Sequence, residues 1–183
     1  MAKLVLHDTV SLCHFGEVGR LNLLESQHAH LSEPRWTSAV NSEVGKGAKL
    51  GISNCSQVLT QGWLGTPMEL SVNDLKKLMP IWIGLNDGQR PPDRHLGEAE
   101  SIYLADKLDG VFMTDDNGAY DFASNPNRLG PGRVIDTVYV LRMAVALDEI
   151  SADEAAKIAS QMESRNRKLR GCHKGKLTAS YFN

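Results

Sequence analysis

Acidic residues follow three separate apolar runs of the chain. They are Asp8, the pair Asp115 and Asp116, and Asp136. In open α/β sheets ligands bind outside the carboxyl ends of the strands, so acids at these positions are candidates for a shared site. A single acid in such a place is most often a helix N-cap. Three of them, in an alternation of strands and helices, favour a common pocket.

Two expected helices contribute further acids. Glu43 follows Val40 by three residues and lies near the edge of a buried helical face, where a carboxylate usually turns outward to water. Glu98 and Glu100 are two residues apart, about 200° around an ideal helix, so we do not expect them to face the same point. Glu98 stands near the start of its helix and could be only a favourable partner of the helix dipole.

Carboxylates that converge need a compensating charge. Two like charges ~4 Å apart repel by about 4 kcal/mol even at an effective dielectric constant of about 20. Either some of the groups keep their protons through raised pKa values, or a divalent cation lies among them. Oxygen ligands alone suit Mg²⁺ or Mn²⁺ better than zinc or copper. On the residues alone, dispersed helix caps and solvated side chains are an equally good interpretation.

The elements that would position these acids are clearest in the stretch 95–123. Apolar residues at helical spacing predict a helix that ends at the breaker Asp109-Gly110. The apolar run 111–113 is typical of a buried parallel strand. Asp116 would then stand between this strand and a further helix.

Other segments extend the same alternation of strands and helices. The predicted elements are a strand at 4–6, a helix interrupted near Gly16 and Gly19, a helix from Ser32 with Pro34 in its first turn, a flexible link at 45–51, a helix opened by Ser71 and stopped by Pro80, a strand at 134–135, and a last helix opened by the capping box of Ser151 and Glu154. The pattern is that of an α/β protein.

Length and charge limit the organisation of the chain. With 183 residues, 42% of them hydrophobic, it can form one well-buried core, and we predict a single domain over 1–183. The net charge is −2, but a basic tail begins at about residue 165. Its cations are Arg165, Arg167, Lys168, Arg170, Lys174 and Lys176. These cations could bind the phosphates of a nucleic acid. They are equally consistent with the solvated end of a helix, where positive charge is favourable.

The cysteines and the apolar runs bear on the compartment. Cys13, Cys55 and Cys172 are odd in number and lack C-x-x-C spacing, which argues against a disulfide framework or a structural zinc site. The first residues lack the apolar run of a signal peptide, and no later run approaches the ~20 residues of a membrane span. We therefore predict a soluble cytoplasmic protein without a membrane partner.

Four motifs in order resemble the PIN domain, a family of small metal-dependent ribonucleases that includes the toxins of many bacterial toxin–antitoxin pairs. The motifs are the run 4–9 with Asp8, the group Trp36, Val40, Glu43 and Val44, the segment 96–105 with Glu98 and Glu100, and Thr114-Asp115-Asp116. The similarity continues through Val134-Ile135-Asp136-Thr137 to the start of the helix at Ser151, and so covers nearly the whole chain.

The resemblance implies both a fold and an activity. The fold would be a three-layer α/β sandwich, with a central, mostly parallel sheet flanked by helices. The activity would be hydrolysis of RNA phosphodiester bonds with Mg²⁺ or Mn²⁺. The metal-binding, catalytic acids would be Asp8, Glu43, Glu100 and Asp116, with Glu98 and Asp115 as secondary candidates. Asp136 stands where members of this family often carry a small polar residue, and we keep it as a group that could support the metal-binding acids without touching the metal.

The resemblance also implies partners. Arg165, Arg167, Lys168 and Arg170 would help to hold the RNA, and the implied protein partners are an antitoxin-like protein and a second copy of the chain. The alternative is a catalytically inert scaffold of the same fold that binds RNA or a partner protein. Other hydrolase classes fit less well, because no G-x-S-x-G turn occurs and Val10 stands where a haloacid dehalogenase phosphatase would need a second acid.

Overall fold

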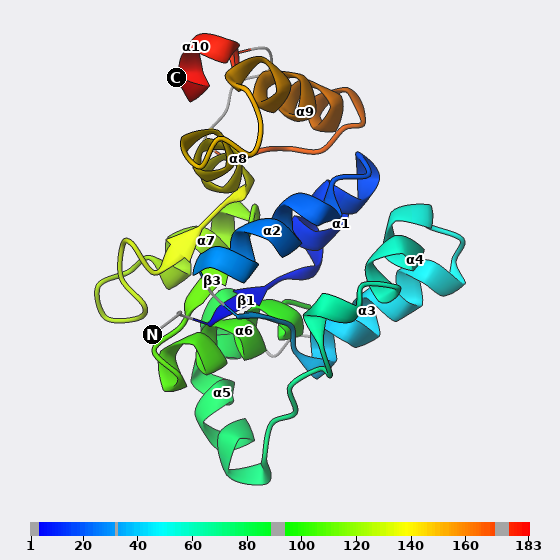
Figure 1. The fold of residues 1–183 in the computed structure, drawn as a ribbon. Coiled ribbons are helices and arrows are strands. Elements are labelled where there is room, and N and C mark those ends of the chain that lie inside the picture. Colours follow the sequence, from blue (N-terminus) through cyan, green and yellow to red (C-terminus); the bar gives the residue numbers. More distant parts are fainter. Residues whose placement is uncertain (1–3, 32, 89–93, 171–175) are drawn as a thin grey trace.

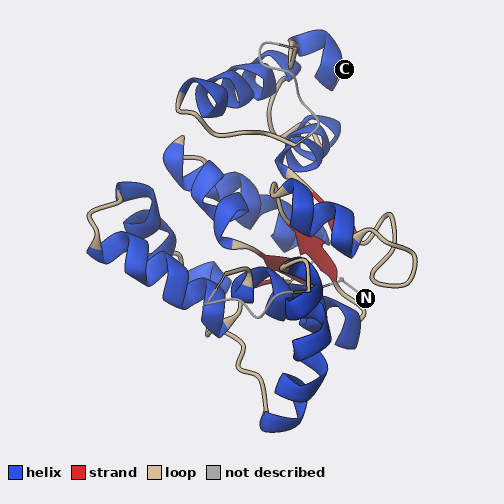
Figure 2. Cartoon of the chain, turned by 180° about the vertical axis from the view of Figure 1, so that it is seen from behind, coloured by secondary structure: helices blue, strands red, loops and turns tan. Residues whose placement is uncertain are grey.

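Four short parallel strands lie at the centre of the fold in the order β2-β1-β3-β4 (Figure 1). They are β1 (Val5–His7), β2 (Pro34–Arg35), β3 (Val111–Met113) and β4 (Val134–Ile135). The computed structural model describes residues 4–31, 33–88, 94–170 and 176–183. All pairings among the four strands are parallel, and helices surround the sheet (Figure 2). The predicted α/β sandwich with a mostly parallel sheet is therefore confirmed.

Helices make up most of the described chain. They are α1 (Thr9–Glu17), α2 (Leu21–Leu31), α3 (Ser38–Lys49), α4 (Ser53–Leu59), the 3₁₀ turn η1 (Gly62–Leu64), α5 (Val72–Leu85), α6 (Leu96–Lys107), α7 (Asn117–Ala123), α8 (Thr137–Ala146), α9 (Ala152–Ser164) and α10 (Ala179–Phe182). No helix in the described ranges combines the length and the apolar character needed to cross a bilayer.

Each face of the sheet carries its own hydrophobic layer. Leu6 pairs in register with Phe112, and both are fully buried in a layer formed with α5, α6 and α7. Val5 and Met113 point to the opposite face, because side chains alternate along a strand, and they pack in a layer formed with α1, α2 and α8. Figure 1 shows α1, α2 and α8 on one side of the strands and α6 on the other. This second layer extends to Phe182 in α10.

The strand order creates a switch point between β1 and β3. From β1 the chain continues to β2 on one side of the sheet, whereas from β3 it continues to β4 on the other. The connections therefore diverge at the carboxyl ends of β1 and β3, where open α/β sheets bind their ligands. Asp8 directly follows β1, and the segment 114–116 directly follows β3.

The prediction that Pro34 lies in the first turn of a helix was wrong. Pro34 is the first residue of the edge strand β2, where a missing backbone N–H breaks no pairing with a further strand. The N–H of Val5 donates to the carbonyl of Glu33 (3.0 Å) and joins β1 to this edge. Helix α3 begins only at Ser38, capped by the Thr37 hydroxyl, which accepts from the N–H of Val40 (3.2 Å).

The flexible link predicted at 45–51 is mostly the second half of α3, which continues to Lys49. Of its glycines, Gly47 is required for close packing. A Cβ built on Gly47 would lie 2.5 Å from Sγ of Cys55, so α4 can approach α3 only because residue 47 has no side chain. A Cβ on Gly45 would meet nothing within 4 Å.

Gly47→Ala should destabilise the protein by about 1–3 kcal/mol, because the new methyl group overlaps the Cys55 thiol. The matched change Gly45→Ala, two residues away in the same helix, should stabilise it by about 0.5–1 kcal/mol through helix propensity. Urea unfolding of both variants measures the difference. Shifts in the same direction would contradict the close packing of α3 and α4.

The prediction that Pro80 ends a helix was also wrong, because α5 continues to Leu85. A proline inside a helix costs about 3 kcal/mol through the lost N–H and its steric clash. Leu78 and Ile81, on either side of Pro80, are buried in the hydrophobic layer that contains Leu6 and Phe112. Their burial offsets part of the cost of the proline. The predicted start of the helix is confirmed by a complete capping box of Ser71 and Asp74.

Candidate functional site

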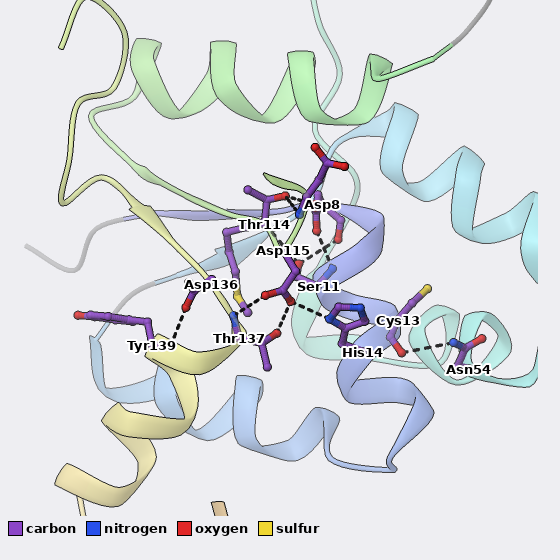
Figure 3. Close-up of polar contacts among 12 residues, drawn as sticks. Asp8, Ser11, Cys13, His14, Asn54, Thr114, Asp115, Asp136, Thr137 and Tyr139 are labelled. Atoms are coloured by element: carbon purple, nitrogen blue, oxygen red, sulfur yellow. Dashed lines mark hydrogen bonds and ion pairs between the residues drawn. The ribbon is translucent and has the colours of Figure 1, made fainter. Parts of the chain in front are cut away.

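Asp8 is the most buried acid at the switch point. Its side chain caps α1, where Oδ1 accepts a hydrogen bond from the N–H of Ser11 (2.6 Å), and Oδ2 accepts one from the Thr114 hydroxyl (2.5 Å; Figure 3). Burial, together with the nearby charge of Glu98, raises the pKa of Asp8 to about 8, although these two hydrogen bonds oppose the shift. At neutral pH Asp8 therefore holds a proton that a positive charge could displace.

Glu43 and Glu98 lie beside one another on α3 and the first turn of α6. The Thr9 hydroxyl donates to Oε2 of Glu43 (2.5 Å). A Cβ on Gly97 would be 3.2 and 3.3 Å from the two Glu43 oxygens, so only a small residue there lets the carboxylate approach α6. The pKa of Glu98 is raised by burial and by the charge of Glu43, while His95, whose Nδ1 lies 3.3 Å from Oε1, opposes the shift.

The carboxyl groups of Asp8, Glu98 and Glu43 are thus linked electrostatically, one to the next. We call these three residues the carboxylate cluster. Asp8 is affected by Glu98, and Glu98 by Glu43. They come from the end of β1, from α6 and from α3, so acids that are far apart in the chain affect one another's pKa in the folded protein. Such mutual repulsion is what a bound cation would relieve.

Glu100 points elsewhere. Its Oε2 accepts a hydrogen bond from the N–H of Ala39 (3.0 Å) in the first turn of α3, and the Thr37 hydroxyl also contacts it. Burial and the charge of Glu43 raise its pKa. The sequence ranked Glu100 above Glu98 as a metal ligand, but the structure couples Glu98, not Glu100, to Asp8. The two have different hydrogen-bond partners, Ala39 for Glu100 and His95 for Glu98, although the charge of Glu43 affects both.

Asp116 is connected to Asp8 through Thr114. Oδ1 of Asp116 accepts from the N–H of Ala119 (2.8 Å) and caps α7, while its own N–H donates to the Thr114 hydroxyl (3.0 Å). The same hydroxyl donates to Asp8. Within the described residues, Oδ2 of Asp116 accepts no hydrogen bond. From the sequence, Thr114 was named as part of a motif but given no role, although a hydroxyl directly after a buried strand is a signal for such a role.

Asp115 belongs to a separate buried network. Its Oδ2 lies 2.7 Å from Nδ1 of His14 and accepts from the Thr137 hydroxyl, and its Oδ1 accepts from the N–H of Thr137 (3.1 Å; Figure 3). Both oxygens are thus used in joining β3 to α1 and α8. We therefore assign Asp115 to the stability of the fold and not to the carboxylate cluster. His14 and Thr137 were not singled out from the sequence.

Removal of the Asp115 carboxylate should cost about 3–5 kcal/mol, because His14 and Thr137 would be left buried without their partner. The variant to measure is Asp115→Ala, by urea unfolding. Its control is Asp121→Ala, since Asp121 is 72% exposed and pairs only at the surface, where about 0–1 kcal/mol is expected. A cost of Asp115→Ala no greater than that of Asp121→Ala would contradict this assignment.

Helix N-termini stabilise most of the acids at this edge. The acids at the starts of helices are Asp8 at α1, Glu98 at α6, Asp116 at α7 and Asp136 at α8, and Glu100 lies against the start of α3. Exposed N–H groups and the helix dipole favour negative charge there. Asp136 accepts from the N–H of Tyr139 (2.8 Å), and burial raises its pKa. The expectation that single acids act as N-caps holds for Asp8, Asp116 and Asp136.

The donor set of the carboxylate cluster fits a hard divalent cation, because all its ligand atoms are carboxylate oxygens and its buried groups carry raised pKa values. The Oδ2 atom of Asp116 could serve as an additional ligand to such a cation. In the described ranges, no three His, Cys, Asp or Glu side chains lie close enough together to form a ready-made metal site. A bound cation would therefore have to draw these carboxylates together.

The basic tail is held against the protein by ion pairs. Arg165 and Arg167 both pair with Glu17 at the end of α1, the second at 3.0 Å. Arg170 pairs with Asp121 (3.0 Å) and lies over the ring of Tyr120. Lys168 is exposed. Lys174 and Cys172 lie outside the described residues, and Cys13 and Cys55 are buried free thiols.

The chain matches no family model, and no curated protein is significantly similar to it.

Proposed function

We propose that this protein is a Mg²⁺- or Mn²⁺-dependent endoribonuclease that hydrolyses RNA phosphodiester bonds. The observation that carries the proposal is the buried carboxyl of Asp8, coupled to Glu98 and through it to Glu43 at the switch point between β1 and β3. The order of the PIN-like motifs supports RNA as the substrate. By the same resemblance we propose that the protein is the toxin of a toxin–antitoxin pair and acts in the cytoplasm. Its protein partners would be an antitoxin-like protein and a second copy of the chain.

Asp8, Glu43, Glu98 and Asp116 would hold the cation. When bound, such a cation supplies a water of lowered pKa and stabilises negative charge on the leaving oxygen. The protein's own part is to fix the carboxylates. Ser11 and Thr114 orient Asp8, Thr9 orients Glu43, and His95 contacts Glu98. With a cation in place, Asp8 would release its proton to solvent, since its raised pKa reflects burial without a compensating charge.

The decisive experiment is cleavage of labelled single-stranded and structured RNA in Mn²⁺, in Mg²⁺ and in EDTA. We expect cleavage that requires the metal, is lost in Asp116→Asn and is retained in Asp121→Asn. Asp121 lies on the same helix as the acid under test but is exposed and outside the cluster. Equal cleavage in EDTA, or undiminished cleavage by Asp116→Asn, would overturn the proposal.

One observation favours a second candidate, a catalytically inert scaffold that binds RNA or a partner protein. Several of the acids already receive hydrogen bonds from helix N-termini, so the fold can hold them without a cation. A scaffold of this kind would bind RNA equally well in EDTA and would cut it under no condition.

A further inference from the structure

A cleft of about 730 Å³ lies outside the carboxylate cluster, along the edge strand β4. Its walls come from α7, α8, Arg170 and the C-terminal helix α10, which lies beside α8 (Figure 1). Pockets for small molecules typically have volumes of about 300–1,000 Å³. The cleft contains none of Asp8, Glu43, Glu98 and Asp116 among its lining residues.

The polar part of this lining consists of three tyrosines, two arginines, one carboxylate and one amide: Tyr120, Tyr139, Tyr181, Arg142, Arg170, Asp136 and Asn183. Tyr139 on α8 and Tyr181 on α10 are 48% and 44% exposed, so their rings are open to a ligand. Tyr120 lies deeper, and its hydroxyl donates to the carbonyl of Val134 (3.3 Å). Aromatic rings of this kind act as stacking platforms for planar groups.

Arg142 supplies a free positive charge in the same cleft. It follows Tyr139 by three residues on α8, so the two side chains share one face of the helix. Its guanidinium lies 5.7 Å from the centre of the Tyr181 ring and forms no ion pair with any acid that the structure describes. A second cation, Arg170, covers the Tyr120 ring at 3.4 Å and is partly neutralised by Asp121 and by Asp136 at 4.0 Å.

We propose that this cleft binds a nucleotide. The base would stack on the ring of Tyr139 or Tyr181, and the phosphate would bind to the guanidinium of Arg142. Base stacking on an aromatic side chain is worth about 1–3 kcal/mol, and an arginine binds a phosphate through two parallel hydrogen bonds. The ligand is either a free nucleotide or one residue of an RNA strand, and the same chemistry recognises both.

The site is independent of the proposed nuclease activity, because it shares no residue with the carboxylate cluster. Binding is therefore measured in EDTA, by calorimetry, with four probes: AMP, adenosine, ribose 5-phosphate and an RNA octamer. AMP should bind at least about 10-fold more tightly than adenosine or ribose 5-phosphate, since only AMP carries both groups. An octamer that binds more tightly than AMP identifies an RNA strand as the source, and equal affinity identifies a free nucleotide.

Variants locate the binding in the cleft. Arg142→Ala, and the double change of Tyr139→Ala and Tyr181→Ala, should each weaken AMP binding by about 10-fold or more. The matched control is Arg128→Ala, since Arg128 also lies over an aromatic ring, that of Phe122 at 4.9 Å, but outside the cleft. No binding of AMP or octamer, or equal losses in all three variants, would overturn the proposal. Thermal melting of each variant confirms that these surface changes leave the fold intact.

Discussion

The Asp8→Asn variant is expected to lose RNA cleavage by at least about 100-fold and to gain stability at neutral pH. The loss corresponds to about 2.7 kcal/mol of transition-state stabilisation and follows from the removal of the most buried carboxyl group of the proposed metal site. The fold should survive, because Asn can still accept from the N–H of Ser11 and can donate to the Thr114 hydroxyl. The combination of lost activity and raised stability distinguishes a functional acid from a structural one.

The gain in stability has a defined pH dependence. The pKa of Asp8 is about 8 in the folded protein and near its usual value of 3.8 in the unfolded chain. Below pH 4 both states are protonated and Asp8 has no effect. As the pH rises towards 8, only the unfolded chain ionises, so the wild-type protein loses about 1.4 kcal/mol per pH unit. Asp8→Asn removes this loss.

Urea unfolding at pH 4, 6 and 8 in EDTA measures this dependence. The stability difference between Asp8→Asn and the wild type should grow steadily with pH and reach about 5 kcal/mol at pH 8. The exposed acid Asp121, changed to Asn, should show no such trend. A difference that shrinks as the pH rises would contradict the burial of an uncompensated carboxyl at position 8.

Glu98→Gln is expected to reduce cleavage by about 100-fold or more, and Glu100→Gln by less than about 10-fold. Glu98 is electrostatically coupled to Asp8, whereas Glu100 is occupied by the N–H of Ala39. A glutamine at either position keeps the size and one acceptor oxygen, so the pair differs only in the place of the lost charge. Rates measured with saturating Mn²⁺ compare them directly. The reverse order would restore Glu100 as the ligand and contradict the cluster described above.

Local patterns were sufficient for the elements that surround the switch point. The strand at 111–113, the break before it and the helix after Asp116 follow from apolar runs and from breakers, which act over a few residues. The same holds for β1 and for the capped start of α9, where Ser151 accepts from the N–H of Glu154. The helix caps at Asp8 and Asp136 are equally local.

The errors arose where distant packing decides the local structure. A two-residue strand at Pro34 has no periodicity of its own and exists because β1 lies beside it. The sequence around Gly47 is typical of a loop, and the reason for a glycine in a helix at this position is its contact with Cys55, which is distant in sequence. The continuation of α5 beyond Pro80 likewise depends on buried neighbours.

The candidate site was predictable in composition but not in geometry. Sequence order placed acids after β1 and β3. The rotation of α6 depends on packing across the core, and it decides that the charge of Glu98 affects Asp8 while Glu100 accepts from the N–H of Ala39. The basic tail shows the same limit. Arg165 and Arg167 bind Glu17, a residue almost 150 positions earlier in the chain. A cluster of cations in sequence does not show that their charges are free.

Mn²⁺ binding to the purified protein tests most directly whether the carboxylate cluster holds a cation. Electron paramagnetic resonance of free Mn²⁺ at pH 7.5, without RNA, would be compared for the wild type, Asp8→Asn and Asp121→Asn. We expect Mn²⁺ to bind to the wild type and to Asp121→Asn with equal affinity, and at least about 10-fold more weakly to Asp8→Asn. Equal affinity in all three proteins, or no binding to the wild type, would contradict a metal centre at the switch point.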